Sequence, residues 1–160
     1  MRVFRETQAF RQWWLFLILG SMLIISMISF FSKSSGFELN NHGMIAFILS
    51  LLIAILFWAT KLETRIDASG IHTQFIPFNF FRKNFRWNEI SNCFVREYSP
   101  ISEYGGWGVR GFGTAKAYNV SGNMGIQIVT KDAKKFLIGT NKPEDAKKVI
   151  KYYQNKSVDT

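Results

Sequence analysis

Two uncharged apolar runs near the N-terminus constrain the fold of this chain most strongly. Trp13–Phe31 contains no charged residue, and a helix of that length is about 28 Å long, close to the ~30 Å hydrocarbon core of a bilayer. Met44–Ala59 is also uncharged, and it reaches a spanning length when Leu39–Gly43 or Thr60 is included. A chain of 160 residues could not cover two helices that are apolar on every side. The runs therefore predict transmembrane helices over about 13–31 and 41–60.

A signal peptide is the alternative for the first run, because Arg2, Arg5 and Arg11 precede it. The run is longer than the ~7–15 apolar residues of a signal peptide, and no Ala-x-Ala cleavage site follows. A second apolar run begins soon afterwards, at Met44. A helical hairpin over residues 1–60 explains both runs together.

Lysine and arginine predict the orientation of this hairpin. The loop between the runs has Lys33 balanced by Glu38, whereas both flanks are basic. The flanking residues are Arg2, Arg5 and Arg11 before the first run, and Lys61, Arg65, Arg82, Lys83 and Arg86 after the second. Basic flanks favour the cytoplasm, so we expect an integral protein of the cytoplasmic (inner) membrane with both termini inside. A stripe of Ala46, Ser50 and Ala54 either lets the helices approach closely or arises by chance.

Residues 61–160 predict one β-rich domain. Leu62–Ala68 alternates apolar and polar side chains, Ser69-Gly70 supplies a turn, and Ile71–Ile76 resumes the alternation, which predicts a β-hairpin. The other expected strands cover 85–89, 92–98, 115–120, 125–131 and 135–139.

A C-terminal helix is expected after Asn141, the predicted N-cap, with Glu144 as its capping-box partner. Its predicted buried face consists of Ala146, Val149, Ile150 and Tyr153. The expected fold is thus two transmembrane α-helices followed by a mainly-β split barrel, which the C-terminal α-helix caps.

Several stretches of the chain carry a family resemblance. They are Phe85–Ile90 (FRWNEI), Tyr98–Gly108 (YSPISEYGGWG), Ala117–Gln127 (AYNVSGNMGIQ) and Ile138–Ala146 (IGTNKPEDA). The chain resembles small bacterial membrane proteins that have an N-terminal two-helix hairpin and a pleckstrin-homology-like (PH-like) cytoplasmic domain. The resemblance implies the fold but no activity, since that family has no assigned function and PH-like domains bind lipids, peptides and proteins.

The glycine-rich segment before Gly113 is the first candidate site. Gly106–Gly111 matches GxGxxG, but no helix and no acidic ribose partner follow, so we expect no dinucleotide cofactor. Tyr104, Trp107 and Arg110 are residue types enriched at binding hot spots, and Gly105, Gly106 and Gly108 permit tight turns. These six residues predict a partner-binding surface. The alternative is a glycine-rich bulge whose aromatic side chains fold back onto the core.

A basic aromatic stretch is the second candidate. Arg82, Lys83 and Arg86 lie among phenylalanines and could rest on anionic lipid headgroups, at about 1 kcal/mol for each basic residue. The alternative is a solvated loop. Nucleic acid is not expected as a partner, because the membrane tether and its cytoplasmic flanks already explain the net charge of +9.

No catalytic constellation is recognisable in the sequence. Cys93 is the only cysteine and is expected in the core, and His42 and His72 lie in different parts of the chain, so neither a metal site nor an enzyme is predicted. The expected function is binding of a protein or peptide partner at the cytoplasmic membrane surface. The alternatives are sensing of anionic lipid and a structural role in a larger membrane complex through the helices.

Overall fold

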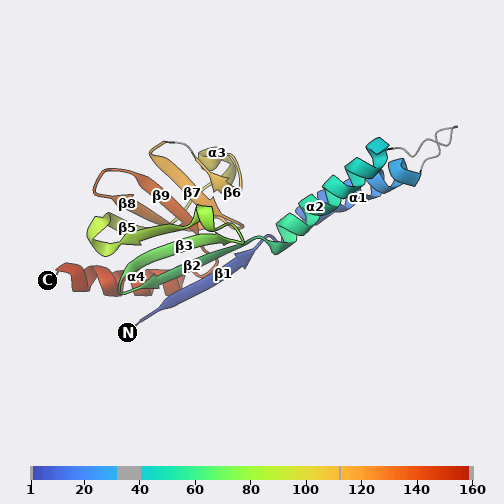
Figure 1. The fold of residues 1–160 in the computed structure, drawn as a ribbon. Helices are drawn as coiled ribbons and strands as arrows, with labels where there is room; N and C mark the ends of the chain where they lie inside the picture. Colours follow the sequence, from blue (N-terminus) through green and yellow to red (C-terminus); the bar gives the residue numbers. More distant parts are fainter. Residues whose placement is uncertain (1, 32–40, 112, 159–160) are drawn as a thin grey trace. The chain divides into compact units, whose positions relative to one another are not determined.

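A computed structural model describes residues 2–31, 41–111 and 113–158 of the chain (Figure 1). The residues form two compact units. The helical unit covers residues 10–60, and the β unit combines residues 1–9 with residues 61–160.

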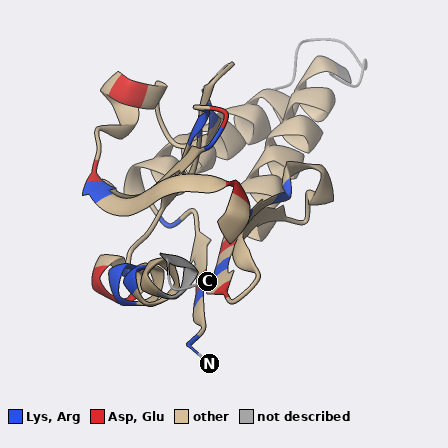
Figure 2. Ribbon diagram, turned by 90° about the vertical axis from the view of Figure 1, so that its left-hand side faces the viewer, with Lys and Arg blue, Asp and Glu red and all other residues tan. Residues whose placement is uncertain are grey.

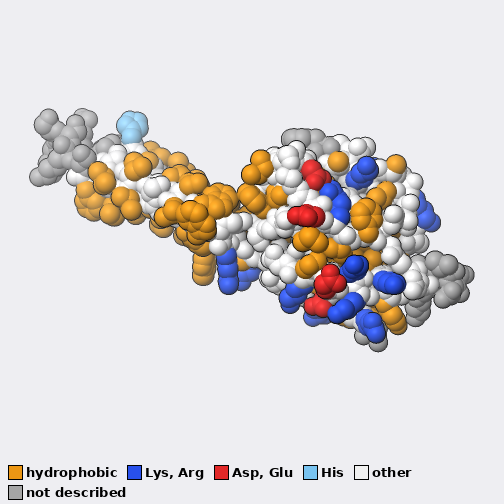
Figure 3. Space-filling model, turned by 180° about the vertical axis from the view of Figure 1, so that it is seen from behind, with side chains coloured by type: hydrophobic (Ala, Val, Ile, Leu, Met, Phe, Trp, Pro, Cys, Tyr) orange, Lys and Arg blue, Asp and Glu red, His pale blue; other side chains and the backbone are white. Residues whose placement is uncertain are grey.

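The helical unit contains two long antiparallel helices, α1 (Trp13–Phe31) and α2 (Asn41–Ala59). Neither helix carries a charged residue (Figure 2), and hydrophobic side chains cover the visible surface of this unit (Figure 3). Both helices are long and apolar enough to cross a membrane. The prediction of two long apolar helices is therefore confirmed.

Small residues bring the two helices together. The Ser26 and Ser50 hydroxyls are buried and lie 3.0 Å apart. A Cβ atom on Gly43 would lie only 2.9 Å from the Ser29 carbonyl oxygen. The predicted stripe is thus correct at Ser50, whereas Ala46 is exposed and Gly43 makes the close approach one turn earlier.

The β unit contains two sheets. The first sheet has the order β1-β2-β3-β4, all antiparallel, with strands Phe4–Ala9, Lys61–Asp67, Gly70–Ile76 and Lys83–Arg86. The second has the order β5-β8-β9-β7-β6, and its strands in chain order are Ile90–Glu97, Gly108–Arg110, Ala115–Asn119, Met124–Thr130 and Lys135–Gly139. Its neighbours are antiparallel except for β7 and β9, which are parallel.

Strand β1 changes the expected domain boundary. The sequence predicted a hairpin over residues 1–60, but β1 pairs with β2 along its whole length, from Phe4 opposite Ile66 to Ala9 opposite Lys61. The helices are thus inserted between two neighbouring strands of one sheet. The sequence pattern did not reveal β1 as a strand, because its inward-facing positions include the polar residues Glu6 and Gln8.

The core lies between the two sheets. Alternate side chains of β1, β2 and β3 face inward, and the fully buried residues include Leu62 and Ile71 of the first sheet and Ile126 of the second. Aromatic rings join the sheets, because the Tyr118 ring lies 5.4 Å from that of Phe75, and the Phe136 ring lies 5.0 Å from that of Phe85.

Helix α4 (Pro143–Val158) packs against β1, β2, β5 and β8. Its predicted face is confirmed, since Ala146, Val149, Ile150 and Tyr153 are all buried. Its start differs from the prediction. Asn141 lies before the first turn, and its side-chain amide donates to the Ser121 hydroxyl at 3.3 Å.

Three short elements complete the fold. They are a 3-10 turn at Asn79–Phe81, a second at Trp87–Glu89, and helix α3 at Pro100–Tyr104. The strand predicted over 85–89 therefore has the wrong bounds. Strand β4 ends at Arg86, and the second 3-10 turn follows it. The mostly β domain with two sheets and a C-terminal helix is confirmed.

Candidate functional site

The glycine-rich segment connects opposite edges of the second sheet. It leaves β5 at one edge and enters β6 at the other. Tyr98 packs with Leu137 and Ala117 in a small buried cluster, and Tyr104 packs against that cluster with its ring 6.0 Å from the Tyr98 ring. The segment therefore supplies core residues as well as surface.

The predicted partner-binding residues divide between these two roles. Tyr104 is half-buried, as the fold-back alternative required, and Trp107 is also half-buried. Gly105 ends α3 with φ 71°, a left-handed conformation that favours glycine. Arg110 is exposed, but its Nε donates to the Trp107 carbonyl at 2.8 Å, and its guanidinium lies against Gly106. The Gly108 amide donates to the Asn119 side chain at 2.9 Å.

An ion pair fixes α3 on the edge strand β5. Arg96 donates to both carboxylate oxygens of Glu103, at 3.2 and 2.7 Å. The hydrogen bond from Arg96 lowers the pKa of Glu103. Several polar groups of this segment therefore form hydrogen bonds that stabilise its own conformation.

The three predicted lipid-surface residues are all exposed but do not line one pocket. Arg82 lines a polar hollow on the outer face of the first sheet, together with Arg5, Glu63 and Arg65. Lys83 lines a different pocket. Arg86 is exposed at the far end of β4.

The pocket that includes Lys83 is a candidate site that the sequence did not predict. It has a volume of about 630 Å³ and lies between β4 and the second sheet; we call it the lysine cleft. Five lysines line it: Lys83, Lys116, Lys131, Lys134 and Lys135. The rings of Phe85 and Phe136, 5.0 Å apart, give it an apolar wall. Four of the lysines lie far from Lys83 in sequence, and only the group at 131–135 could have signalled a basic site.

Two carboxylates also line the lysine cleft. Asp132 pairs with Lys134 at 2.5 Å, and the hydrogen bond from Lys134 lowers the pKa of this exposed carboxyl group. Glu89 accepts a hydrogen bond from the Arg86 amide. Among the described residues, Lys83, Lys116, Lys131 and Lys135 form no ion pair. The cleft is therefore a net basic site.

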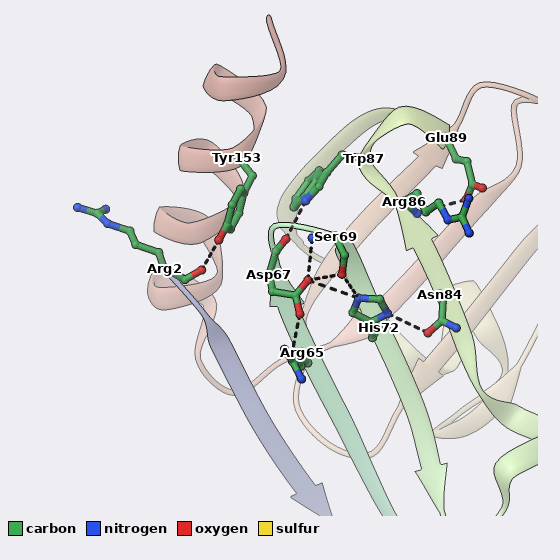
Figure 4. Close-up of polar contacts among 10 residues, drawn as sticks. All are labelled: Arg2, Arg65, Asp67, Ser69, His72, Asn84, Arg86, Trp87, Glu89 and Tyr153. Atoms are coloured by element: carbon green, nitrogen blue, oxygen red, sulfur yellow. Dashed lines mark hydrogen bonds and ion pairs between the residues drawn. The ribbon is translucent and has the colours of Figure 1, made fainter. Parts of the chain in front are cut away.

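A second polar group lies at the turn between β2 and β3 (Figure 4). The Ser69 hydroxyl is 2.5 Å from Asp67 and 2.9 Å from Nε2 of His72, whose Nδ1 lies 2.9 Å from the Asn84 side-chain oxygen. Burial acts to raise the pKa of Asp67, but hydrogen bonds from Ser69 and the charges of His72 and Arg65 lower it to about 2.

This group has the composition of a serine–histidine–aspartate triad but not its geometry. The carboxylate contacts the serine hydroxyl, and an amide occupies the side of the imidazole where a triad has its acid. The Trp87 indole also donates to the Asp67 carbonyl, at 2.8 Å (Figure 4). The contacts tie the turn to β4 and Trp87. The His72 side chain is only partly exposed.

Cys93 lies in the core, as expected, with 2% of its surface exposed. Burial raises the pKa of its thiol to about 12, so the reactive thiolate is suppressed at neutral pH.

Taken together, these features define a class: a β unit with a basic cleft, interrupted between its first two strands by a pair of long apolar helices. Comparison with protein-family models and with curated proteins finds no match to this chain.

Proposed function

We propose that this protein is a membrane-anchored binding module. In this proposal α1 and α2 span the cytoplasmic membrane with both termini in the cytoplasm. The β unit, which resembles bacterial PH-like domains, binds a protein or peptide partner at the membrane surface. The lysine cleft is the observation that carries the proposal.

The exposure of the helices supports the membrane part. Only 17% of the most apolar window of α1 and 11% of that of α2 is buried. Apolar surface of this extent requires an apolar environment. Trp13 begins α1 and Trp58 lies near the end of α2, and each is about three-quarters exposed, as suits indole rings at a membrane interface.

The composition of the lysine cleft supports the binding part. Pockets of several hundred Å³ with an apolar wall and a few convergent polar groups are typical ligand sites. Here the convergent groups are lysine ammonium groups from β4, β7, β9 and the β8–β9 turn. Their shared charge selects a negatively charged partner.

Site-specific photo-crosslinking in native membranes tests this proposal. A photoreactive amino acid replaces Thr114, which lines the cleft, and a matched control replaces Lys148, which is exposed on α4. We expect one protein adduct from position 114 that position 148 does not give. The same protein adducts from both positions, or no protein adduct from either position, would contradict the proposal.

One observation favours lipid contact as a second candidate. Phe80 is 74% exposed and is closely followed by the exposed Arg82 and Lys83. An apolar ring beside basic residues suits an anionic membrane surface. The fluorescence that Phe80→Trp adds to the native tryptophan emission of the full-length protein should then be quenched by brominated lipid when the protein is reconstituted with anionic lipid. Unchanged fluorescence would remove this candidate.

A further inference from the structure

Strand β4 leaves one edge of the first sheet without a neighbouring strand. The sheet order β1-β2-β3-β4 makes β4 terminal, and among the described residues its strand partner is β3 alone. One row of its backbone groups therefore points away from the sheet, and of the β4 amides that of Arg86 already donates to the Glu89 carboxylate. Such an edge is a template for an added strand.

The lysine cleft lies beside this strand. Lys83, Asn84 and Phe85 of β4 line it on one side, and residues of β7, β9 and the β8–β9 turn line the other. The segments just before and just after β4 contact the second sheet or its β8–β9 turn. The Lys131 amide donates to the Glu89 carbonyl at 2.9 Å, and the Phe81 ring lies 6.3 Å from the Tyr118 ring.

Side-chain alternation separates the two faces of β4. Phe85 points inward toward Phe136, so Lys83, two residues earlier, shares that face. Asn84 points to the outer face and contacts His72. A strand added beside β4 would likewise direct every second side chain into the cleft, toward the lysines.

We propose that the lysine cleft binds an extended acidic segment of a partner protein, which adds to β4 as a further strand. This inference rests on the proposed function and specifies its partner. Backbone hydrogen bonds to β4 supply sequence-independent affinity, and carboxylates at alternate positions meet the lysines. Lysine suits this role because its ammonium is a point charge on a flexible stem and does not require one fixed geometry.

The length of β4 limits the segment. Four residues of strand, at about 3.4 Å each, extend for about 14 Å, so roughly four residues of the partner would pair. Two of these would face the cleft. Free phosphate or a lipid headgroup could satisfy the lysines but would leave the edge of β4 unpaired, which is why we favour a peptide.

The test uses the full chain in nanodiscs of neutral phosphatidylcholine. The probe is a dye-labelled peptide in which glutamate alternates with threonine, and binding is followed by fluorescence anisotropy. The charge-reversed protein Lys116→Glu, Lys135→Glu should weaken binding by about tenfold. The matched control, Lys147→Glu, Lys148→Glu on α4, has the same net charge and should change the Kd by less than about twofold.

Backbone methylation of the probe tests strand addition itself. Successive amides of a strand point to opposite edges, so methylating one alternate set should abolish binding while methylating the other set is tolerated. Equal effects of both methylated sets would overturn strand addition. Equal weakening by the cleft and control proteins would overturn the assignment to the cleft.

The experiments distinguish a failure of the proposed binding function from a failure of the acidic-strand proposal. A crosslinked protein at position 114, combined with no binding of the acidic probe, would retain the proposed function and overturn the acidic strand. Displacement of the probe by inositol hexakisphosphate, with both methylated probes binding equally, would assign the cleft to a phosphate-bearing ligand instead.

Discussion

Ala9 and Lys61 are direct partners in the β1–β2 ladder, although the whole helical unit stands between them in sequence. The chain leaves the β unit from one strand and re-enters it on the next. The N-terminal residues are therefore part of the folded β unit and not a free tail before the first helix.

This pairing predicts that the β unit survives removal of the helices only if β1 is kept. Joining Ala9 to Lys61 through Asn-Gly, a two-residue hairpin turn, should give a soluble folded domain with a cooperative urea transition. Residues 61–160 alone should be less stable by several kcal/mol, because β2 becomes an edge and the buried Phe4 is lost. Equal urea midpoints for the two proteins would contradict the role of β1.

Glu6 should be a stabilising contact of β1. Its carboxylate is buried and accepts hydrogen bonds from the Thr140 hydroxyl at 2.6 Å and the Asn141 amide at 2.8 Å. Glu6→Ala should lower the free energy of unfolding by about 2–4 kcal/mol, since a buried donor and a part-buried donor lose their charged acceptor. Arg5→Ala, on the exposed face of the same strand, should change it by less than about 0.5 kcal/mol. Urea unfolding of the Ala9–Asn-Gly–Lys61 protein measures both, and equal effects would refute the prediction.

Asp67 should make stability depend on acid pH. Its folded pKa is about 2, below the ordinary 3.8, so the ionised form is favoured by folding. The contribution is fully present above about pH 5 and is lost as the pH falls through 4 toward 2. Asp67→Asn should cost about 1–2 kcal/mol at pH 7 and much less at pH 2.5. Urea curves at both pH values check this, and a pH-independent cost would show that the charge of Asp67 is not responsible.

Two glycines of the helical unit should respond differently to alanine. A Cβ at Gly43 meets the backbone of Ser29 and Phe30 at about 3 Å, whereas a Cβ at Gly20 meets nothing within 4 Å. Gly43→Ala should therefore separate the helices, and Gly20→Ala should not. Oxidative crosslinking of a Ser26→Cys, Ser50→Cys pair, in a Cys93→Ala background, reports the distance. Equal crosslinking rates in the two variants would contradict the close approach at Gly43.

The local sequence determined the elements whose pattern is complete within one stretch. The uncharged run Trp13–Phe31 predicted α1 to the residue, the alternation of Leu62–Ala68 and Ile71–Ile76 predicted β2 and β3, and the spacing from Ala146 to Tyr153 predicted the buried face of α4. Periodicity is a local property, so it can be recognised without knowing what each face packs against.

Features that depend on contacts between residues far apart in the chain were decided only by the tertiary structure. Strand β1 has polar residues at inward positions because Glu6 meets Thr140 and Asn141, and nothing near Glu6 in sequence indicates them. The predicted partner surface around Tyr104 became partly core because the segment crosses a whole sheet. The lysine cleft exists because β4, β7 and the β8–β9 turn converge in space, and side chains from separate strands form one site only when the sheets are packed together.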